Sequence, residues 1–361
     1  MNKHYFSRLL SLLLVLFISS CGGGGDSSDA SPNSRKKGTV YGVVFDAPVS
    51  GSKVTVWEFK DGTVGRNLGS AVTDQLGNYE VEVTSASMPI YVEALGGAYR
   101  DPITSEVITV SNGKSLTMSS VANYQEGVTQ PIMVTPLTHM VSGLTEFNVQ
   151  AGVSASSAIN DALERFESMY GFDVNEIKPI DITQGGQSSY AQSGHKYGAL
   201  LTAYSSFSGD LINKYPSDES RTLYTSMHLS DIQYRDIRAD GVLDGQEVDG
   251  NGVAKKMNFG QVDITADIYT NDLSQHTLIV VNNPDLNLSG TSAEDYQEFA
   301  TQLNILGTSS DTSGVVAPRD MKPIDETPPE ISREGGNVLA GADQITLAIS
   351  DDVGVNDVTV S

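Results

Sequence analysis

Residues 42–56 read GVVFDAPVSGSKVTV, and residues 73–79 read TDQLGNY; these two stretches decide the fold of the N-terminal part of the chain. Apolar and polar residues alternate here and in the segment 90–94, which reads IYVEA. Alternation with period two is typical of strands that bury one face. Gly and Pro residues between the alternating segments supply turns. The sequence therefore predicts a small antiparallel β-sandwich over residues 39–120.

The turn residues and valines of these stretches also form a family pattern. The pattern resembles that of the carboxypeptidase regulatory-like domains, which are prealbumin-like β-sandwiches found in many surface proteins. It consists of Pro48, Val49, Gly51, Val54, Val56, Thr73, Asp74, Gly77 and Tyr79. The resemblance implies a structural or binding module, and no catalytic residue carries over with it.

Helical patterns follow the strand region. Thr135 can cap a helix and Pro136 suits its first turn. Apolar residues recur at helical spacing over 154–170, 197–215 and 295–306, which indicates helices with one buried face. We therefore expect a mainly α-helical domain over residues 131–307.

The last part of the chain returns to strand patterns. Residues 308–326 are polar and are interpreted as a linker, and alternation resumes at 345–349. Residues 327–361 resemble the opening of a bacterial immunoglobulin-like repeat, although such a domain needs about 100 residues and seven strands. We expect either that the sequence is truncated or that a partner completes this sheet. The predicted fold class is thus multidomain: an N-terminal antiparallel β-sandwich, a central mainly helical domain and a partial C-terminal Ig-like segment.

The N-terminal residues point to export. Lys3 and Arg8 precede a short apolar run at 9–18, and small residues then lead to Cys21, the one cysteine of the chain. About ten apolar residues are too few to span a bilayer, which takes about 20. A cleaved secretory signal fits that length better.

This order of residues resembles the signal and lipobox of bacterial lipoproteins. The resemblance implies cleavage after a signal peptide at 1–20, a diacylglycerol on the Cys21 thiol and an acylated amino group. Residues 21–38 would form a flexible tether, since they are rich in Gly and Ser and cannot bury a core. Gly22, in place of an aspartate, favours the outer membrane, so we expect an envelope protein that faces the periplasm or the cell surface.

The charge of the chain limits its partners. The sequence holds 22 Lys and Arg residues against 45 Asp and Glu residues, for a formal net charge of -23. Such a surface repels phosphate backbones, so no nucleic-acid partner is expected. It attracts divalent cations.

One acidic stretch has the spacing of a calcium loop. Residues 236–247 read DIRADGVLDGQE. Calcium loops place oxygen ligands at positions one, three, five, seven, nine and twelve, with glycine at six. The predicted ligands are Asp236, Asp240, the carbonyl of Val242, Asp244 and Glu247.

Two features depart from the calcium pattern. Arg238 stands at the third position, where a ligand belongs, and residues 249–252 are a poor helix start. The alternatives are an acidic surface turn, or a loop folded differently in which Asp249 and Asn251 contribute. Calcium and the lipid on Cys21 are the two cofactors that the sequence suggests.

Motifs of familiar enzymes are missing from the sequence. It has no His-Glu-x-x-His, no Gly-x-Ser-x-Gly and no phosphate-binding glycine loop. No catalytic residue is predicted, and the leading hypothesis is a lipid-anchored binding or adhesion module for a glycan or a protein ligand. The alternatives are an exported hydrolase with its site in the helical domain, and an envelope scaffold in which calcium stiffens a domain junction.

Overall fold

The computed structural model describes residues 35–110, 117–215, 225–248 and 253–294, together with 296–297, 299–300 and two strands at 330–333 and 347–350. The expected signal peptide, Cys21 and most of the expected tether lie outside these residues. So does most of the predicted linker and C-terminal segment.

A three-stranded sheet with the order β4-β1-β9 forms one layer. Its central strand, β1 (Lys37–Val43), pairs antiparallel with β4 (Asn78–Thr84) and parallel with β9 (Thr129–Pro131). Val40 and Val43 are fully buried, whereas Tyr41 between them is exposed. The sheet therefore buries one face and presents the other to solvent.

A four-stranded antiparallel sheet with the order β3-β2-β5-β8 forms the next layer. Its strands are β2 (Lys53–Lys60), β3 (Thr63–Val72), β5 (Met88–Leu95) and β8 (Thr117–Tyr124). The two sheets share one apolar cluster, to which Val40 and Val81 contribute from the first and Val54 and Ile90 from the second. This arrangement is consistent with a β-sandwich.

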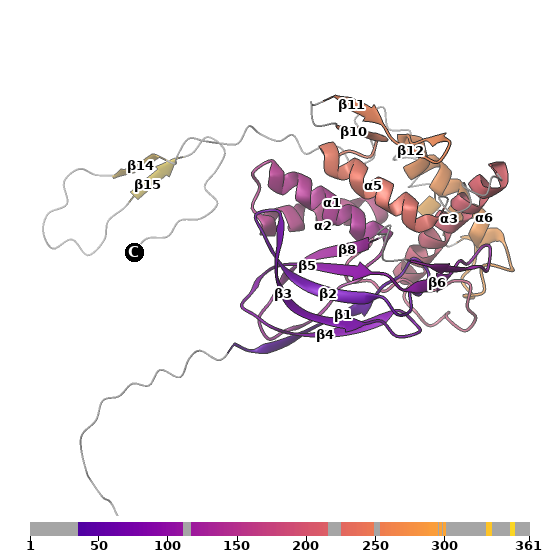
Figure 1. Ribbon diagram of the computed structural model, residues 1–361, viewed down its shortest axis with the longest axis horizontal. Helices are drawn as coiled ribbons and strands as arrows, with labels where there is room; N and C mark the ends of the chain where they lie inside the picture. Colours follow the sequence, from indigo (N-terminus) through magenta and orange to yellow (C-terminus); the bar gives the residue numbers. More distant parts are fainter. Residues whose placement is uncertain are drawn as a thin grey trace, which may run out of the picture. The chain divides into compact units, whose positions relative to one another are not determined.

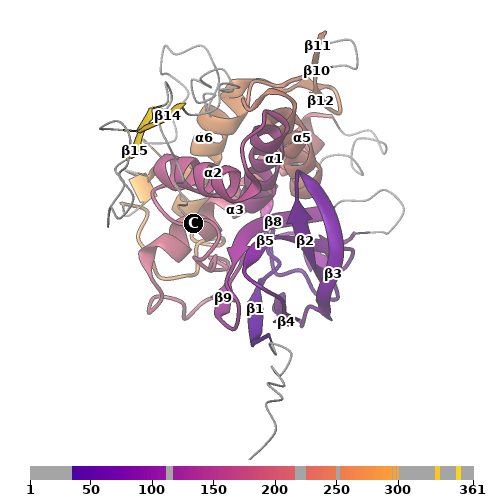
Figure 2. The same ribbon diagram turned by 90° about the vertical axis from the view of Figure 1, so that its left-hand side faces the viewer.

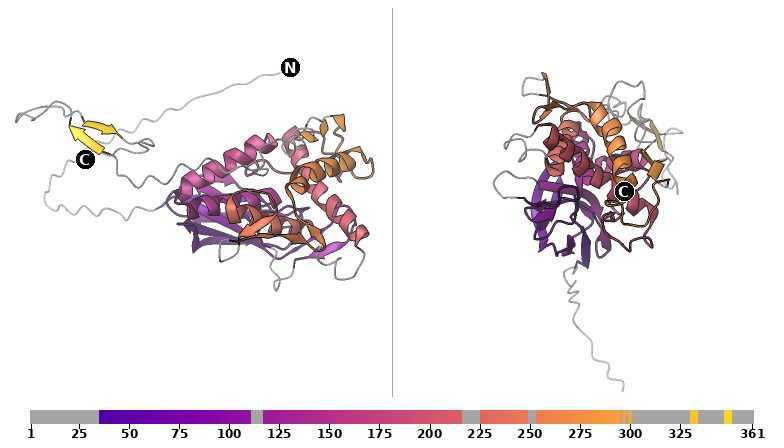
Figure 3. Two further views of the ribbon diagram at one scale, coloured as in Figure 1. Left: turned by 90° about the horizontal axis from the view of Figure 1, so that it is seen from above. Right: turned by 90° about the vertical axis from the view of Figure 1, so that its right-hand side faces the viewer.

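Helices cover the other face of the four-stranded sheet. Figures 1 and 2 show that sheet between the helices and the layer of β1, β4 and β9, and Figure 3 shows the molecule from above. A second apolar cluster joins Tyr91 of β5 and Val121 of β8 to Met140, Leu144 and Phe166 of the helices. The strands and helices are thus held by a shared core.

Short polar side chains fix where the helices start. The Thr135 hydroxyl accepts a hydrogen bond from the Thr138 amide, and the Thr135 amide donates to the Thr138 hydroxyl oxygen. This reciprocal pair closes a capping box before α1 (Pro136–Gln150). Ser154 caps α2 (Ala155–Tyr170), which ends at the left-handed Gly171. Thr225 caps α5 (Ser226–Asp240).

The remaining elements complete the helical part. α3 (Gln192–Lys214) packs against α6 (Leu273–Asn282), which follows a π-helical turn at Ile268–Asp272. Short hairpins project from the layers: β6 (Ala98–Arg100) with β7 (Val107–Thr109), β10 (Gln246–Val248) with β11 (Ala254–Lys256), and β12 (Asn258–Phe259) with β13 (Val262–Asp263).

The structure is a mixed α/β protein with several sheets and helices. The alternating segment at 90–94 lies within β5, and the helix predicted at 154–170 coincides with α2 and its cap. At the C-terminus, β14 (Glu330–Arg333) pairs antiparallel with β15 (Leu347–Ser350). β3 and α5 are elements that the sequence patterns did not predict.

Candidate functional site

The acidic stretch 236–247 starts inside a helix. Asp236 and Asp240 lie within the last two turns of α5, and the helix ends at Gly241, whose φ of +82° is left-handed. The turn therefore begins at Gly241 and not at Asp236. Gly241 has the role of a helix C-cap, which accounts for a glycine at that position without a metal.

Asp236 closes this turn onto the helix. Its carboxylate is fully buried and accepts hydrogen bonds from the backbone amides of Gly245 (2.9 Å) and Gln246 (3.2 Å). The Tyr269 hydroxyl donates to the same group at 2.6 Å. Burial raises the pKa of Asp236 from 3.8 to about 7, although the hydrogen bonds from Tyr269 and Gly245 favour the ionised form.

The other two aspartates bind the backbone of the same turn. Asp240 accepts from the Val242 amide at 2.9 Å, and Asp244 accepts from the Gln246 amide at 2.9 Å and from the Gln246 side chain at 2.8 Å. Burial raises the pKa of Asp240. Both carboxylates therefore act as local turn stabilisers.

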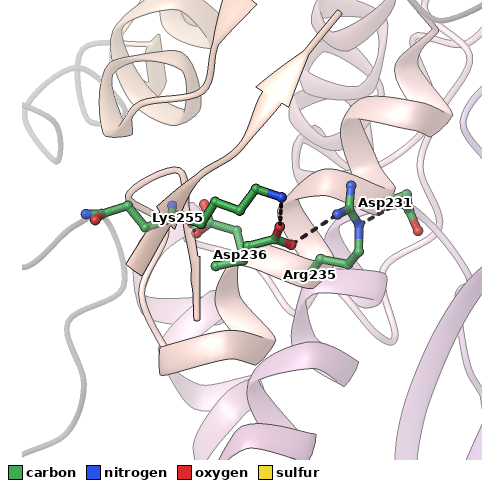
Figure 4. Close-up of polar contacts among 6 residues, drawn as sticks. Asp231, Arg235, Asp236 and Lys255 are labelled. Carbon is green, nitrogen blue, oxygen red and sulfur yellow. Dashed lines mark hydrogen bonds and ion pairs between the residues drawn. The ribbon is translucent and has the colours of Figure 1, made fainter. Parts of the chain in front are cut away.

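Glu247 lies between two cations. Its carboxylate is 3.4 Å from Arg235 of α5 and 3.6 Å from Lys255, the residue paired with it across the β10–β11 hairpin. Arg235 also contacts Asp231 at 3.1 Å, and Figure 4 shows this row of charges between Asp231 and Lys255. The ion pairs link the hairpin to the helix.

These contacts bear on the predicted calcium site. The structure places Asp236 and Asp240 at the end of α5, Val242 and Asp244 in the turn after it, and Glu247 in β10. The carboxylate oxygens of the four acidic residues take part in internal hydrogen bonds and ion pairs. Arg238 turns to Glu146, with its Nε 2.6 Å from the carboxylate. Among the described residues, no group of three or more His, Cys, Asp or Glu side chains is arranged to hold a metal ion. Calcium stays a prediction, and Asp249 and Asn251 lie outside the described residues.

A larger hollow lies where the sandwich-like part meets the helical part. This polar cleft has a volume of about 900 Å³. Its wall comes from five segments: residues 47–50, 75–76, the β6–β7 hairpin at 98–107, 181–187 and 285–286. The cleft could not be predicted from local sequence patterns, because these segments are far apart in the chain.

Hydroxyl, amide and charged groups line much of the polar cleft. They belong to Ser50, Gln75, Arg100, Ser105, Asp181, Thr183, Gln184, Gln187 and Asp285. The loops that carry them are braced from within, since Asp101 accepts from the amides of Ile103 (2.9 Å) and Thr104 (2.8 Å). Asp181 likewise accepts from the amide and hydroxyl of Thr183, at 3.0 and 2.6 Å. The cleft is thus preformed.

A buried polar cluster lies behind the cleft wall. Ser226, the first residue of α5, donates a hydrogen bond to Asp46, and the Tyr99 hydroxyl lies 3.2 Å from that of Ser226. Asp46 is 1% exposed, and its Oδ1 has no partner among the described residues. Burial raises the pKa of Asp46 from 3.8 to about 7, against the effect of the Ser226 hydrogen bond. Tyr99 and Asp101 connect this cluster to the cleft, because both line it.

Two histidines contact serine hydroxyls. Ser119 and His139 are joined at 2.8 Å, but both are nearly fully buried, and burial lowers the pKa of His139 to about 3. Ser206 and His276 are joined at 2.9 Å between α3 and α6. These pairs satisfy buried polar groups between packed elements, so they do not present a nucleophile to a substrate.

Comparisons with known proteins leave the family open. No protein-family model and no curated protein sequence matches the chain. Among solved structures, a 9R-lipoxygenase from Cyanothece PCC8801 is similar over 54% of this chain and 27% of its own, with 12% identity and a TM-score of 0.18. The chain therefore spans about a quarter of that protein, and a likeness at this level supports no statement about fold or activity. Among the described residues, no helix is long and apolar enough to cross a membrane.

Proposed function

We propose that this protein is an exported, lipid-anchored binding module of the cell envelope, and that the polar cleft is its ligand site. In this proposal Cys21 carries the lipid, residues 39–120 are a carboxypeptidase regulatory-like sandwich, and residues 327–361 begin an Ig-like repeat. The membrane partner is reached through the lipid and the tether. The protein acts by capture and carries out no reaction.

The polar cleft is the observation that carries this proposal. Ligand sites are preformed hollows of about 300–1,000 Å³ with a few convergent polar groups, and the cleft of about 900 Å³ falls in that range. Its lining supplies amides, hydroxyls and carboxylates, hence both donors and acceptors, which suits the hydroxyl groups of a saccharide. We therefore favour a glycan over a protein as the ligand.

Binding of soluble polysaccharide fragments tests the proposal. The full chain in detergent is titrated by calorimetry against a panel of envelope and host-surface oligosaccharides. Gln184→Ala and Gln187→Ala remove hydrogen-bonding groups from the cleft and should each weaken binding about tenfold, as expected when a hydrogen bond to the ligand is lost. Gln275→Ala, at an exposed position on α6, is the matched control and should bind like wild type. A panel without saturable binding would reject the glycan assignment.

The lipid anchor has its own test. Intact mass of the protein extracted from membranes should correspond to a chain that starts at Cys21 and carries acyl groups. Cys21→Ser should lose the acyl mass and the membrane association together. An unmodified wild-type chain that starts at Met1 would reject the anchor.

Calcium belongs to the proposal as a stabiliser of the α5 turn. Metal bound only to the folded state raises its melting temperature. We expect millimolar calcium to raise the melting temperature of wild type relative to chelator, and to leave the Asp240→Asn/Asp244→Asn variant unchanged. Equal melting temperatures for wild type under both conditions would remove calcium from the proposal.

An exported hydrolase is the second candidate, and one observation favours it. Asp46 and Asp101 are two buried carboxyl groups near one another, and the charge of Asp101 adds to the raised pKa of Asp46. A buried carboxyl group with a raised pKa, placed next to a second carboxyl group beside a cleft, is typical of acid–base catalysis. Turnover of the same oligosaccharides that Asp101→Asn abolishes would favour the hydrolase over the binding module.

A further inference from the structure

A second groove lies on the outer face of the three-stranded sheet. This aromatic groove has a volume of about 740 Å³. Tyr41 of β1 and Pro131 of β9 form its floor with Glu80 of β4, and the end of β3 and residues 176–178 are its walls. Tyr41 pairs in register with both Glu80 and Pro131, so the three residues stand side by side.

Tyr41 presents its ring to this groove. It is 40% exposed, although its neighbour Val40 is fully buried, since alternate residues of a strand point to opposite faces. Val72 at the rim is 66% exposed. An exposed aromatic ring in a hollow is a surface that partners use, because it offers much area at little entropic cost.

The charges around Tyr41 are not balanced. Asp74, Glu80 and Glu176 line the groove, and Lys178 is its one basic residue. Lys178 donates to the Asn78 side chain at 2.8 Å, and Asn78 in turn donates to Asp74. Asp74 also accepts from the amides of Leu76 and Asn78, which lowers its pKa. This rim is therefore a closed network.

Glu80 and Glu176 remain outside that network. Neither carboxylate has an ion-pair partner among the described residues. Burial, with Asp173 and Glu167 nearby, raises the pKa of Glu176, so a cation placed there would relieve the local repulsion. The groove thus offers an aromatic face with two carboxylates, and among its described lining residues the one basic side chain, Lys178, is already hydrogen-bonded to Asn78.

We propose that the aromatic groove binds a basic peptide segment of a partner protein, with a Lys or Arg side chain over the Tyr41 ring and its charged group near Glu80 and Glu176. The face of an aromatic ring attracts a cation, and adjacent carboxylates strengthen the attraction. A net charge of -23 also steers basic partners towards this chain. A saccharide would match the ring but not the excess of carboxylates.

Titration of a short fluorescent peptide tests this proposal on the full chain in detergent. The probe is an eight-residue peptide with three arginines. The negative control is the same peptide with the three arginines replaced by glutamines. Saturable binding is expected for the arginine peptide with a Kd below about 1 mM, and it should weaken as salt is raised. The glutamine peptide should bind at least about tenfold more weakly.

Variants locate the site. Tyr41→Leu keeps apolar area but removes the ring, and it should weaken binding about threefold to tenfold, while Tyr41→Phe should bind within about twofold of wild type. Glu80→Gln should weaken binding by a similar factor. Glu82→Gln removes the same charge from the same strand outside the groove, so it controls for net charge and should have little effect.

The outcomes separate this proposal from the glycan site. Equal loss for Glu80→Gln and Glu82→Gln would mean nonspecific attraction and would overturn it, as would equal binding of the two peptides. Oligosaccharide binding that depends on Tyr41 and not on Gln184 would replace the basic peptide by a sugar. Because Gln184 lies outside this groove, Gln184→Ala should leave peptide binding unchanged whether or not the cleft binds glycan.

Discussion

Asp46 is a carboxyl group that the fold holds away from water, 1% exposed. Ser226 donates to one of its oxygens, and the other oxygen has no partner among the described residues. Removing an ionised carboxylate from water is costly, so the folded protein favours the protonated acid. Burial therefore raises the pKa of Asp46 from 3.8 to about 7.

This raised pKa makes the folded protein less stable as pH rises from 4 to 7. Below pH 4 both the folded and the unfolded state hold the Asp46 proton, whereas between pH 4 and pH 7 only the folded state keeps it. The stabilisation is therefore lost as pH rises through this window, by about 4 kcal/mol for a shift of about three units. Asp46→Asn stays neutral and still accepts from Ser226. Between pH 4 and pH 8, the free energy of unfolding of wild type should fall by about 4 kcal/mol relative to that of Asp46→Asn, as measured by urea denaturation. Parallel pH profiles would contradict the raised pKa.

Asp236 holds the end of α5 to the turn that follows it and to the π-helical turn. It receives hydrogen bonds from Gly245, Gln246 and Tyr269, and so fixes the turn after α5 against the π-helical turn. Asp236→Ala would leave two donors unpaired, the Gly245 amide and the Tyr269 hydroxyl, because the Gln246 amide also donates to Asp244. The variant should lower the free energy of unfolding by about 3 kcal/mol. Asp236→Asn retains an acceptor oxygen and should lose less. A loss below about 1 kcal/mol for the alanine variant would show that water replaces the carboxylate.

Two glycines of α3 allow a matched comparison. A Cβ at Gly198 would lie 1.7 Å from the carbonyl oxygen of Ile180, whereas one at Gly209 would have its nearest contact at 3.4 Å, with the Ile103 side chain. Gly198→Ala must displace backbone and should lower the free energy of unfolding by about 3 kcal/mol. Gly209→Ala should raise it by up to about 1 kcal/mol, since alanine favours helix. Chemical denaturation of both variants checks this, and equal effects would contradict the close approach of α3 to residue 180.

The elements that could be predicted from the sequence are those with a clear local pattern of apolar residues. β4 and β5 alternate clearly, and α2 has both a cap and an apolar stripe. β3 has no such pattern because most of its side chains are exposed and it is held by pairing with β2. The cap of α5 at Thr225 was a usable signal, but the spacing of Asp236 and Gly241 was interpreted as a metal loop. The polar cleft and the Asp46 cluster could not be predicted, since they join residues from segments far apart in sequence.

At the scale of the molecule, the sheets and the helices depend on the same core. Phe59 of β2 and Tyr91 of β5 belong to one apolar cluster with Leu137 of α1 and Phe166 of α2, and Trp57 packs against it. Burial of apolar area drives folding, so exposing this cluster to water would destabilise both the four-stranded sheet and the helices. The sandwich-like part and the helical part should therefore unfold together.

The single tryptophan makes this cooperativity measurable. Trp57 lies in β2, so its fluorescence reports on the sheet, whereas circular dichroism at 222 nm reports on the helices. We expect both signals to show one urea transition with the same midpoint. Val121→Ala, in β8 beside the helices, should move the two midpoints down together, because it removes contacts that both layers share. Two separate midpoints, or a shift in the fluorescence transition alone, would instead establish a sheet that folds independently of the helices, and the polar cleft would then lie at a movable junction.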